Sequence, residues 1–113
     1  MYLLKYPDEV ATDAYTVFTS ALWFYMTPQY PKPSSHDVMA GFMVPTEGDK
    51  KAGIGATFGT TVNIINGGIE CRQGQEKAQV LNRIKYYKAF LNHFKLPEED
   101  ESGMGCANHG FWP

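Results

Sequence analysis

The fold depends on residues 57–68, which read TFGTTVNIINGG. The stretch is rich in β-branched residues, and its Asn66-Gly67 pair is the commonest signal for a tight hairpin turn. Propensity alone therefore predicts a strand and a hairpin. The residues that follow, 70–74, are polar and turn-like, so they offer no second strand. Local sequence leaves the stretch ambiguous between strand and helix.

Clear helical patterns flank this stretch on both sides. Residues 75–94 carry an apolar side chain at every third or fourth position, and Leu96-Pro97 ends the pattern. Residues 14–26 follow a good N-cap pair, Thr12-Asp13, and contain neither Gly nor Pro. Their apolar residues run nearly all round the helix, which predicts that this helix is central and buried.

The connecting segments carry turn and cap signals. Residues 1–12 are expected to be irregular, and the three prolines within residues 28–34 predict an extended loop. Ser34-Ser35 is expected to cap a short helix over residues 36–40 that Gly41 stops. Thr46 is expected to cap a second short turn that runs to residue 53.

Composition excludes several classes of protein. The 113 residues suit a single domain. A formal net charge of −2 and a pI near 5.9 argue against a nucleic-acid partner. No apolar run reaches the roughly 18 residues of a membrane span, and no signal peptide is evident. The sixteen aromatic residues are unusually many, and they suit either a dense core or a surface that binds sugar or a partner.

The two cysteines permit at most one internal disulfide. Cys71 and Cys106 are either free buried thiols or a pair that closes a loop of about 35 residues, which would stabilise the fold by roughly 3.8 kcal/mol. The three histidines, His36, His93 and His109, show no metal-ligand spacing with them. We therefore expect no metal and no cofactor.

Five segments of the chain, taken in order, resemble glycoside hydrolase family 19, the plant-type chitinases. They are residues 18–29 (FTSALWFYMTPQ), 32–38 (KPSSHDV), 63–71 (NIINGGIEC), 83–87 (RIKYY) and 105–108 (GCAN). One such string could arise by chance. Five strings in the family's order and spacing, over nearly the whole chain, indicate homology.

The resemblance implies a fold and a compartment. It implies a mostly α-helical, lysozyme-like chitinase fold, in which residues 1–113 form one domain equivalent to the C-terminal half of the catalytic domain. It places residues 63–68 (NIINGG) in a helix and its end, instead of in a hairpin, with the glycine after Asn66 as the helix stop. It also implies a Cys71–Cys106 disulfide, and hence a secreted, extracellular protein.

The family's chemistry needs residues that this sequence lacks. Family members hydrolyse β-1,4-linked N-acetylglucosamine polymers with inversion, which takes an acid and a base roughly 6.5–9.5 Å apart. The family's acid lies in a His-Glu-Thr-Thr-type motif and its base follows, both before the matched region. Neither motif occurs in the 113 residues. No residue is therefore assigned a catalytic role, and the chain is not expected to be catalytic alone.

Three substrate-binding positions carry over from the resemblance. Asn66 matches an asparagine that hydrogen-bonds sugar, Glu70 matches a cleft glutamate, and Arg83 matches its arginine partner. Such charge pairs tune the pKa of a catalytic carboxyl group. The alternatives are that Asn66 is only a residue at a helix C-terminus and that Glu70–Arg83 is only a structural ion pair.

Other candidate residues have plainer explanations. The aromatic helix around Trp23 is expected to be core and not a sugar platform. His36-Asp37 is expected to cap and pack a helix and not to form a catalytic dyad. Thr19 stands where the family usually has a lysine of the same charge network. The absence of this lysine favours the interpretation that the chain is a divergent or inactive member of the family.

Three functions follow as hypotheses. The first is half of a chitinase-like hydrolase, completed by a longer precursor or a second chain. The second is a non-catalytic protein that binds chitin, N-acetylglucosamine oligosaccharides or a protein partner. Half a cleft should expose apolar surface, so this function predicts a homodimer or a complementary chain that covers it. The third is a small secreted helical domain without glycan activity.

Overall fold

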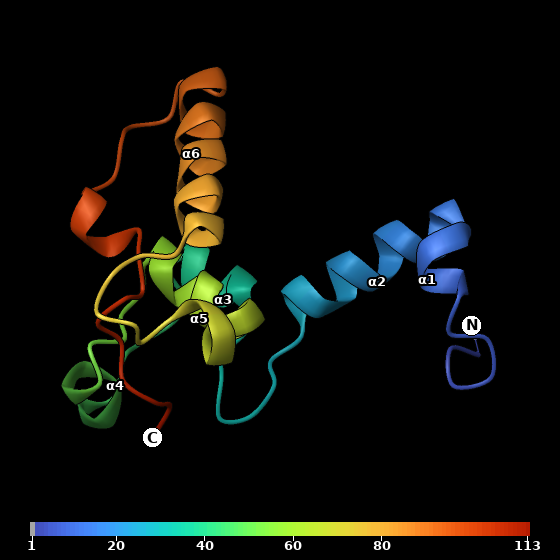
Figure 1. Ribbon diagram of the computed structural model, residues 1–113, viewed down its shortest axis with the longest axis horizontal. Helices are drawn as coiled ribbons and strands as arrows, with labels where there is room; N and C mark the ends of the chain where they lie inside the picture. Colours follow the sequence, from blue (N-terminus) through green and yellow to red (C-terminus); the bar gives the residue numbers. More distant parts are fainter. Residues whose placement is uncertain (1) are drawn as a thin grey trace.

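The computed structural model describes residues 2–113, and its regular secondary structure is helical (Figure 1). The elements are α1 (Glu9–Thr12), α2 (Ala14–Met26), α3 (Ser35–Met39), α4 (Glu47–Lys51), α5 (Phe58–Glu70), α6 (Ala78–His93) and a short 3-10 helix, η1 (Glu101–Gly103). Within residues 2–113 the only strand-like pairing is an isolated bridge between Gln29 and Lys32. The expected mostly helical class is therefore confirmed.

The helices form a central group, made of α3, α4, α5 and α6, from which α1 and α2 extend to one side (Figure 1). In Figure 1, α5 lies at the centre with α3 beside it, and α6 rises from the same region. The short α4 and the C-terminal tail lie at one side of this group, while α1 and α2 project from the other. None of the helices in the described part of the chain is long and apolar enough to cross a lipid bilayer.

Side-chain caps begin three of the helices where the sequence predicts them. The Asp13 carboxylate accepts a hydrogen bond of 2.8 Å from the backbone of Thr16 at the start of α2. The Ser34 hydroxyl accepts one of 3.0 Å from Asp37 at the start of α3. Thr46 and Asp49 form a reciprocal capping box at α4. These bonds satisfy N–H groups that have no partner inside a helix.

Tertiary burial turns the β-branched stretch into α5. Eight of its thirteen residues are buried, including Thr60, Thr61 and Val62. The Thr60 hydroxyl donates to the Gly55 carbonyl (2.5 Å), and the Thr61 hydroxyl donates to the Phe58 carbonyl (2.6 Å). The buried hydroxyls are therefore satisfied without a strand. Packing outweighs β-propensity here, as it often does.

The expected end of this helix needs correction. The resemblance implied that the helix stops at the glycine after Asn66, whereas α5 continues to Glu70. Only Asn66 itself departs from helical geometry, with φ −148° and ψ 36°. The result is a kink and not a stop.

A disulfide joins the end of α5 to the C-terminal tail. Cys71 and Cys106 are bonded, and both are fully buried. They pack with Val62 and Val80, and Phe58 leans against the cluster. The implied pairing is present, and it brings a segment 35 residues away in sequence against α5.

The prediction that residues 14–26 form a buried central helix is wrong. The bounds of α2 agree with the prediction, but only Thr16 is buried in it. Phe18, Leu22 and Trp23 are all more than half exposed. Apolar composition shows what a helix is able to bury, but the described residues supply little to cover this one. Trp23 is therefore not a core residue in this structure.

The aromatic excess is at the surface. Thirteen of the sixteen aromatic residues are exposed, and none is buried. The buried positions hold small or medium side chains instead, such as Val38, Ile54 and Val80. The large rings are thus available to neighbours outside the core.

Smaller departures occur at element ends. Residues 9–12 of the expected irregular lead-in form α1, and α6 begins at Ala78, three residues after the predicted start. Val80 and Leu91 on the predicted stripe of α6 are buried, but Phe94 at its end is exposed. Residues 28–34 form a loop, as expected, but it is not extended throughout, because it turns back between Gln29 and Lys32, which form the isolated bridge.

Candidate functional site

Asn66, Glu70 and Arg83 form one hydrogen-bonded cluster. Arg83 donates two bonds to the Glu70 carboxylate, 2.9 Å from Nε to Oε2 and 3.1 Å from Nη2 to Oε1. The Asn66 side-chain amide donates a third, of 3.2 Å, to Oε1. Two helices meet here, since Asn66 and Glu70 lie on α5 and Arg83 on α6. The structure thus brings together all three residues that the resemblance assigned to a cleft.

The Glu70–Arg83 ion pair is largely shielded from solvent on the Glu70 side. The Glu70 side chain is 5% exposed and the Arg83 side chain 37%. The bond to Arg83 lowers the pKa of Glu70 below its ordinary value of 4.5, and it outweighs the burial that acts in the opposite direction. The same bond raises the pKa of Arg83. Glu70 is therefore a fixed anion at neutral pH, which suits binding and positioning and not proton donation.

Two cations hold the kink that positions Asn66. Lys32 donates from Nζ to the carbonyl oxygens of Asn63 (3.3 Å) and of the next residue (3.5 Å), just before the kink. Arg72 donates from Nη2 to the carbonyl oxygen of Gly67 (2.7 Å), just after it. A kink breaks the regular ladder of helical hydrogen bonds. Donors from outside the helix therefore stabilise its carbonyl groups.

Arg72 also ties the kink to the tail. Its guanidinium donates to the Asn63 side chain (3.2 Å) and to the Gly110 carbonyl (3.4 Å). It also lies 4.5 Å from the centre of the Phe111 ring, a cation–π contact. Its backbone is left-handed, with φ +63°. These contacts hold an arginine in a conformation that favours glycine.

Sequence reasoning missed both of these cations. The Lys32 amine reaches backbone carbonyl groups of α5, and burial, with the nearby charge of Arg72, lowers its pKa. Lys32 begins one of the segments that resemble the family, which was a usable signal. Arg72 lies in a stretch that is polar and turn-like in sequence. Its acceptors include backbone carbonyl groups, whose positions cannot be predicted from residue types.

A mostly apolar groove adjoins the cluster. It has a volume of about 360 Å³ and is lined by α2, α5 and α6, with Arg83 among the lining residues. The aromatic members are Tyr25, Phe58, Tyr86, Tyr87 and Phe90. Phe58 and Tyr87 stack at 4.1 Å between ring centres. Aromatic faces beside a charged pair provide both the flat apolar surface and the polar groups that a sugar ring requires.

Three other candidate residues lie elsewhere. Thr19 donates from its hydroxyl to the Tyr15 carbonyl within α2 (2.6 Å) and lines a small cavity with Leu3 and Trp23. It is not part of the Glu70 cluster. His36 Nδ1 lies 3.2 Å from Oδ1 of its neighbour Asp37 in the first turn of α3. The expectation was that these two residues cap and pack the helix, and the side-chain cap itself comes from Ser34.

Comparison with known proteins identifies the relatives of the chain. The sequence profile of a glycoside hydrolase 19 family, described as chitinase class I, matches residues 1–104. Endochitinase A2 of Pisum sativum is 51% identical over 94 residues, which cover 83% of this chain and 29% of that protein. The endochitinase of Avena sativa is 54% identical over 90 residues, which cover 80% of this chain and 44% of that protein.

A relative described as inactive is about as similar. Inactive chitinase-like protein 1 of Hevea brasiliensis is 50% identical over 106 residues, which cover 94% of this chain and 33% of that protein. The matches thus include proteins described as endochitinases and as inactive, and the chain spans less than half the length of each of these three relatives.

Proposed function

Because the chain belongs to glycoside hydrolase family 19, the chitinase class I family, we propose that it binds N-acetylglucosamine oligosaccharides of the chitin type and does not hydrolyse them on its own. The Asn66–Glu70–Arg83 cluster carries this proposal. It places a hydrogen-bonding amide and a half-exposed guanidinium beside an aromatic groove.

Each residue of the cluster has a separate role in this proposal. Arg83 points a fixed positive charge at the groove and donates to sugar oxygens. Glu70 fixes the arginine through two bonds, and so acts as a positioning residue. Asn66, half-buried at the kink, offers its amide oxygen as an acceptor for a sugar N–H or O–H.

Hydrolysis would require further groups. Inversion needs an acid that is protonated at working pH, whereas the pKa of Glu70 is lowered and the carboxylate is occupied by Arg83. The 113 residues contain no His-Glu-Thr-Thr-type motif. In our proposal the acid and the base of an active enzyme come from a further segment or a second chain, and residues 1–113 supply the supporting side of the cleft.

A non-catalytic partner-binding protein is the second candidate. It is supported by the exposed aromatic face of α2 and by the similarity to inactive chitinase-like proteins. In this candidate the face of α2 is covered by a second copy or by a complementary chain. Under both candidates the disulfide and the plant chitinase relatives support passage through the secretory pathway, and hence a secreted protein.

Calorimetry with a chitin tetrasaccharide tests the binding proposal. Arg83→Gln should weaken binding by about tenfold, since charge-assisted hydrogen bonds are worth about 1.5–3 kcal/mol each. Lys85→Gln, which removes a cation two positions away on the same helix, is the matched control and should bind as the unchanged chain does. A hydrolysis assay run in parallel should show no cleavage.

Two results would contradict the proposal. Equal affinity of Arg83→Gln and the unchanged chain would remove the cluster from the binding site. Cleavage of the tetrasaccharide by the purified 113-residue chain would show that it is catalytic alone.

A further inference from the structure

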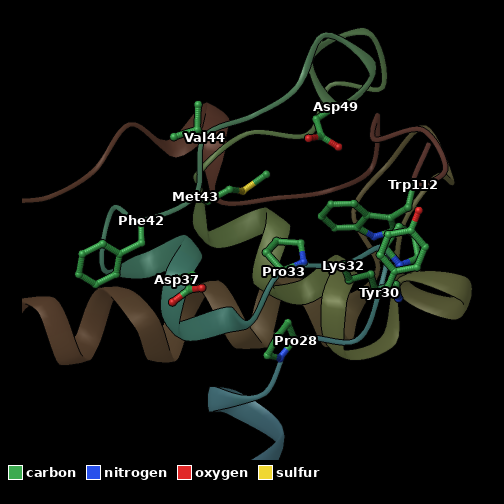
Figure 2. A pocket seen from close by; sticks show the side chains of 11 residues that line it. Pro28, Tyr30, Lys32, Pro33, Asp37, Phe42, Met43, Val44, Asp49 and Trp112 are labelled. Carbon is green, nitrogen blue, oxygen red and sulfur yellow. The ribbon is translucent and has the colours of Figure 1, made fainter.

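A second hollow lies beside the loop of residues 28–33 (Figure 2). None of the residues of the Asn66–Glu70–Arg83 cluster lines it. It has a volume of about 460 Å³, within the range of small-molecule sites. Segment 42–44 and the tail residue Trp112 complete its wall. In Figure 2, Trp112 and Tyr30 are drawn at one end of the hollow and Phe42 at the other. We call this hollow the Trp112 pocket.

The walls of the Trp112 pocket are aromatic and uncovered. Tyr30 is 100% exposed, and Phe42 is also exposed. Met43 and Val44 add aliphatic surface between them. Exposed aromatic rings in the wall of a pocket provide flat apolar faces for a ligand, and the side chains need not move to bind it.

Polar groups with spare hydrogen-bonding capacity complete the pocket. The indole N–H of Trp112 is buried and has no acceptor among residues 2–113. Asp49 uses one carboxylate oxygen, Oδ2, to accept two bonds of 2.8 Å from Thr46. Asp37 uses Oδ1 toward His36. An N–H that is buried without an acceptor is a cost that a bound group can relieve.

Charge narrows the chemistry of the ligand. Asp37 and Asp49 line the pocket together with one cation, Lys32, whose amine is engaged by backbone carbonyl groups of α5. The excess of carboxylate disfavours a phosphate or another anion. A neutral ligand with several hydroxyl groups and one apolar face fits better, because hydroxyl groups donate to carboxylates and the apolar face covers aromatic rings.

We propose that the Trp112 pocket is a second saccharide site, separate from the Asn66–Glu70–Arg83 cluster, that binds an N-acetylated hexose. The acetamido carbonyl accepts from the Trp112 indole, ring hydroxyl groups donate to Asp37 and Asp49, and the sugar face packs on Tyr30. The preference for an N-acetylated sugar over another neutral sugar rests on the proposed function. Trp112 lies beyond the family match, which ends at residue 104.

The tryptophan content of the chain provides a direct test. The sequence has two tryptophans, Trp23 and Trp112, so Trp23→Phe leaves Trp112 as the only one. Titration of this variant with di-N-acetylchitobiose should give a saturable change in tryptophan emission. Adding Tyr30→Ala should raise the dissociation constant about fivefold to tenfold, since one aromatic contact is lost. Tyr15→Ala, at an exposed tyrosine on α2, is the control and should have no effect.

The test separates this site from the first. Arg83→Gln in the Trp23→Phe background should leave the emission titration unchanged. Absence of a saturable change, with calorimetric binding that still depends on Arg83, would overturn the second site and leave the proposed function intact. An equal response to cellobiose would overturn the assignment to N-acetylated sugars.

Discussion

Glu70 is the centre of the candidate site, since both Arg83 and Asn66 donate hydrogen bonds to its carboxylate. Its side chain is nearly dry, and burial alone would raise its pKa. The two bonds from Arg83, helped by the Asn66 amide, outweigh this effect and lower it. The folded state therefore favours the ionised carboxylate more than the unfolded chain does. Such a group links folding to pH.

Glu70→Gln should destabilise the fold in a pH-dependent way. At pH 7 we expect a loss of about 1–3 kcal/mol in the free energy of unfolding, because the replacement keeps the shape but removes the charge from two bonds. A group with a lowered pKa stabilises above its unfolded value of 4.5. That contribution disappears as the pH falls through the lower folded value. Urea unfolding at a series of pH values measures it.

The control for this prediction is Glu98→Gln, which changes an exposed glutamate in the acidic run. Its effect should be small at every pH. A Glu70→Gln difference that stays constant between pH 7 and pH 3 would contradict the account of Glu70 as an ionised partner of Arg83.

Single residues also show where sequence reasoning stops. The caps at Asp13, Ser34 and Thr46 act within three residues, so their pattern is visible in the sequence. Lys32 and Arg72 act on backbone carbonyl groups. Lys32 reaches its acceptor across 31 residues of sequence. Contacts of this kind depend on the tertiary fold, and helix, strand and turn propensities do not predict them.

At the scale of elements, α2 and α5 form a matched comparison. Both have thirteen residues, yet one residue is buried in α2 and eight are buried in α5. The N-cap and the proline that follows the helix predicted the bounds of α2 correctly, because caps and prolines are local signals. Sequence periodicity predicted the burial of α2 wrongly, because burial depends on what other elements supply. For α5 the local signal favoured a strand, and packing overrode it.

Amide hydrogen exchange should separate these two helices. The amides of α2 should exchange faster than those of α5, by at least about tenfold, since few buried contacts resist local opening of α2. Mass spectrometry of peptides from a timed deuterium exchange measures both helices in one sample. Equal protection of α2 and α5 at low protein concentration would contradict the exposed arrangement of α2.

At the scale of the whole molecule, the surface is unusually aromatic. The aromatic rings lie outside the buried core, and several of the exposed ones belong to α2 and α6. Exposed apolar patches beyond a few hundred Å² generally mark interfaces. The described residues thus leave α2 with an exposed apolar face that includes Phe18, Leu22 and Trp23. The extent of this face could not be read from composition, which predicted a dense core equally well.

The chain alone should therefore self-associate through α2. Light scattering should show a mass above that of a monomer at high concentration. Phe18→Ser with Leu22→Ser should restore the monomer, because both side chains are more than half exposed on α2. Phe111→Ser with Phe42→Ser, two exposed rings away from α2, is the control and should not. A monodisperse monomer at every concentration would exclude this surface as a self-association interface.

The disulfide has a consequence for proteolysis. Cys71 and Cys106 enclose α6 and the exposed acidic segment that follows it. An exposed segment of this kind is where a protease cuts most readily. A single cut there would leave both pieces covalently joined, with Glu70 still paired to Arg83 within one of them. A nicked molecule would thus keep its candidate site and would separate into two fragments only after reduction.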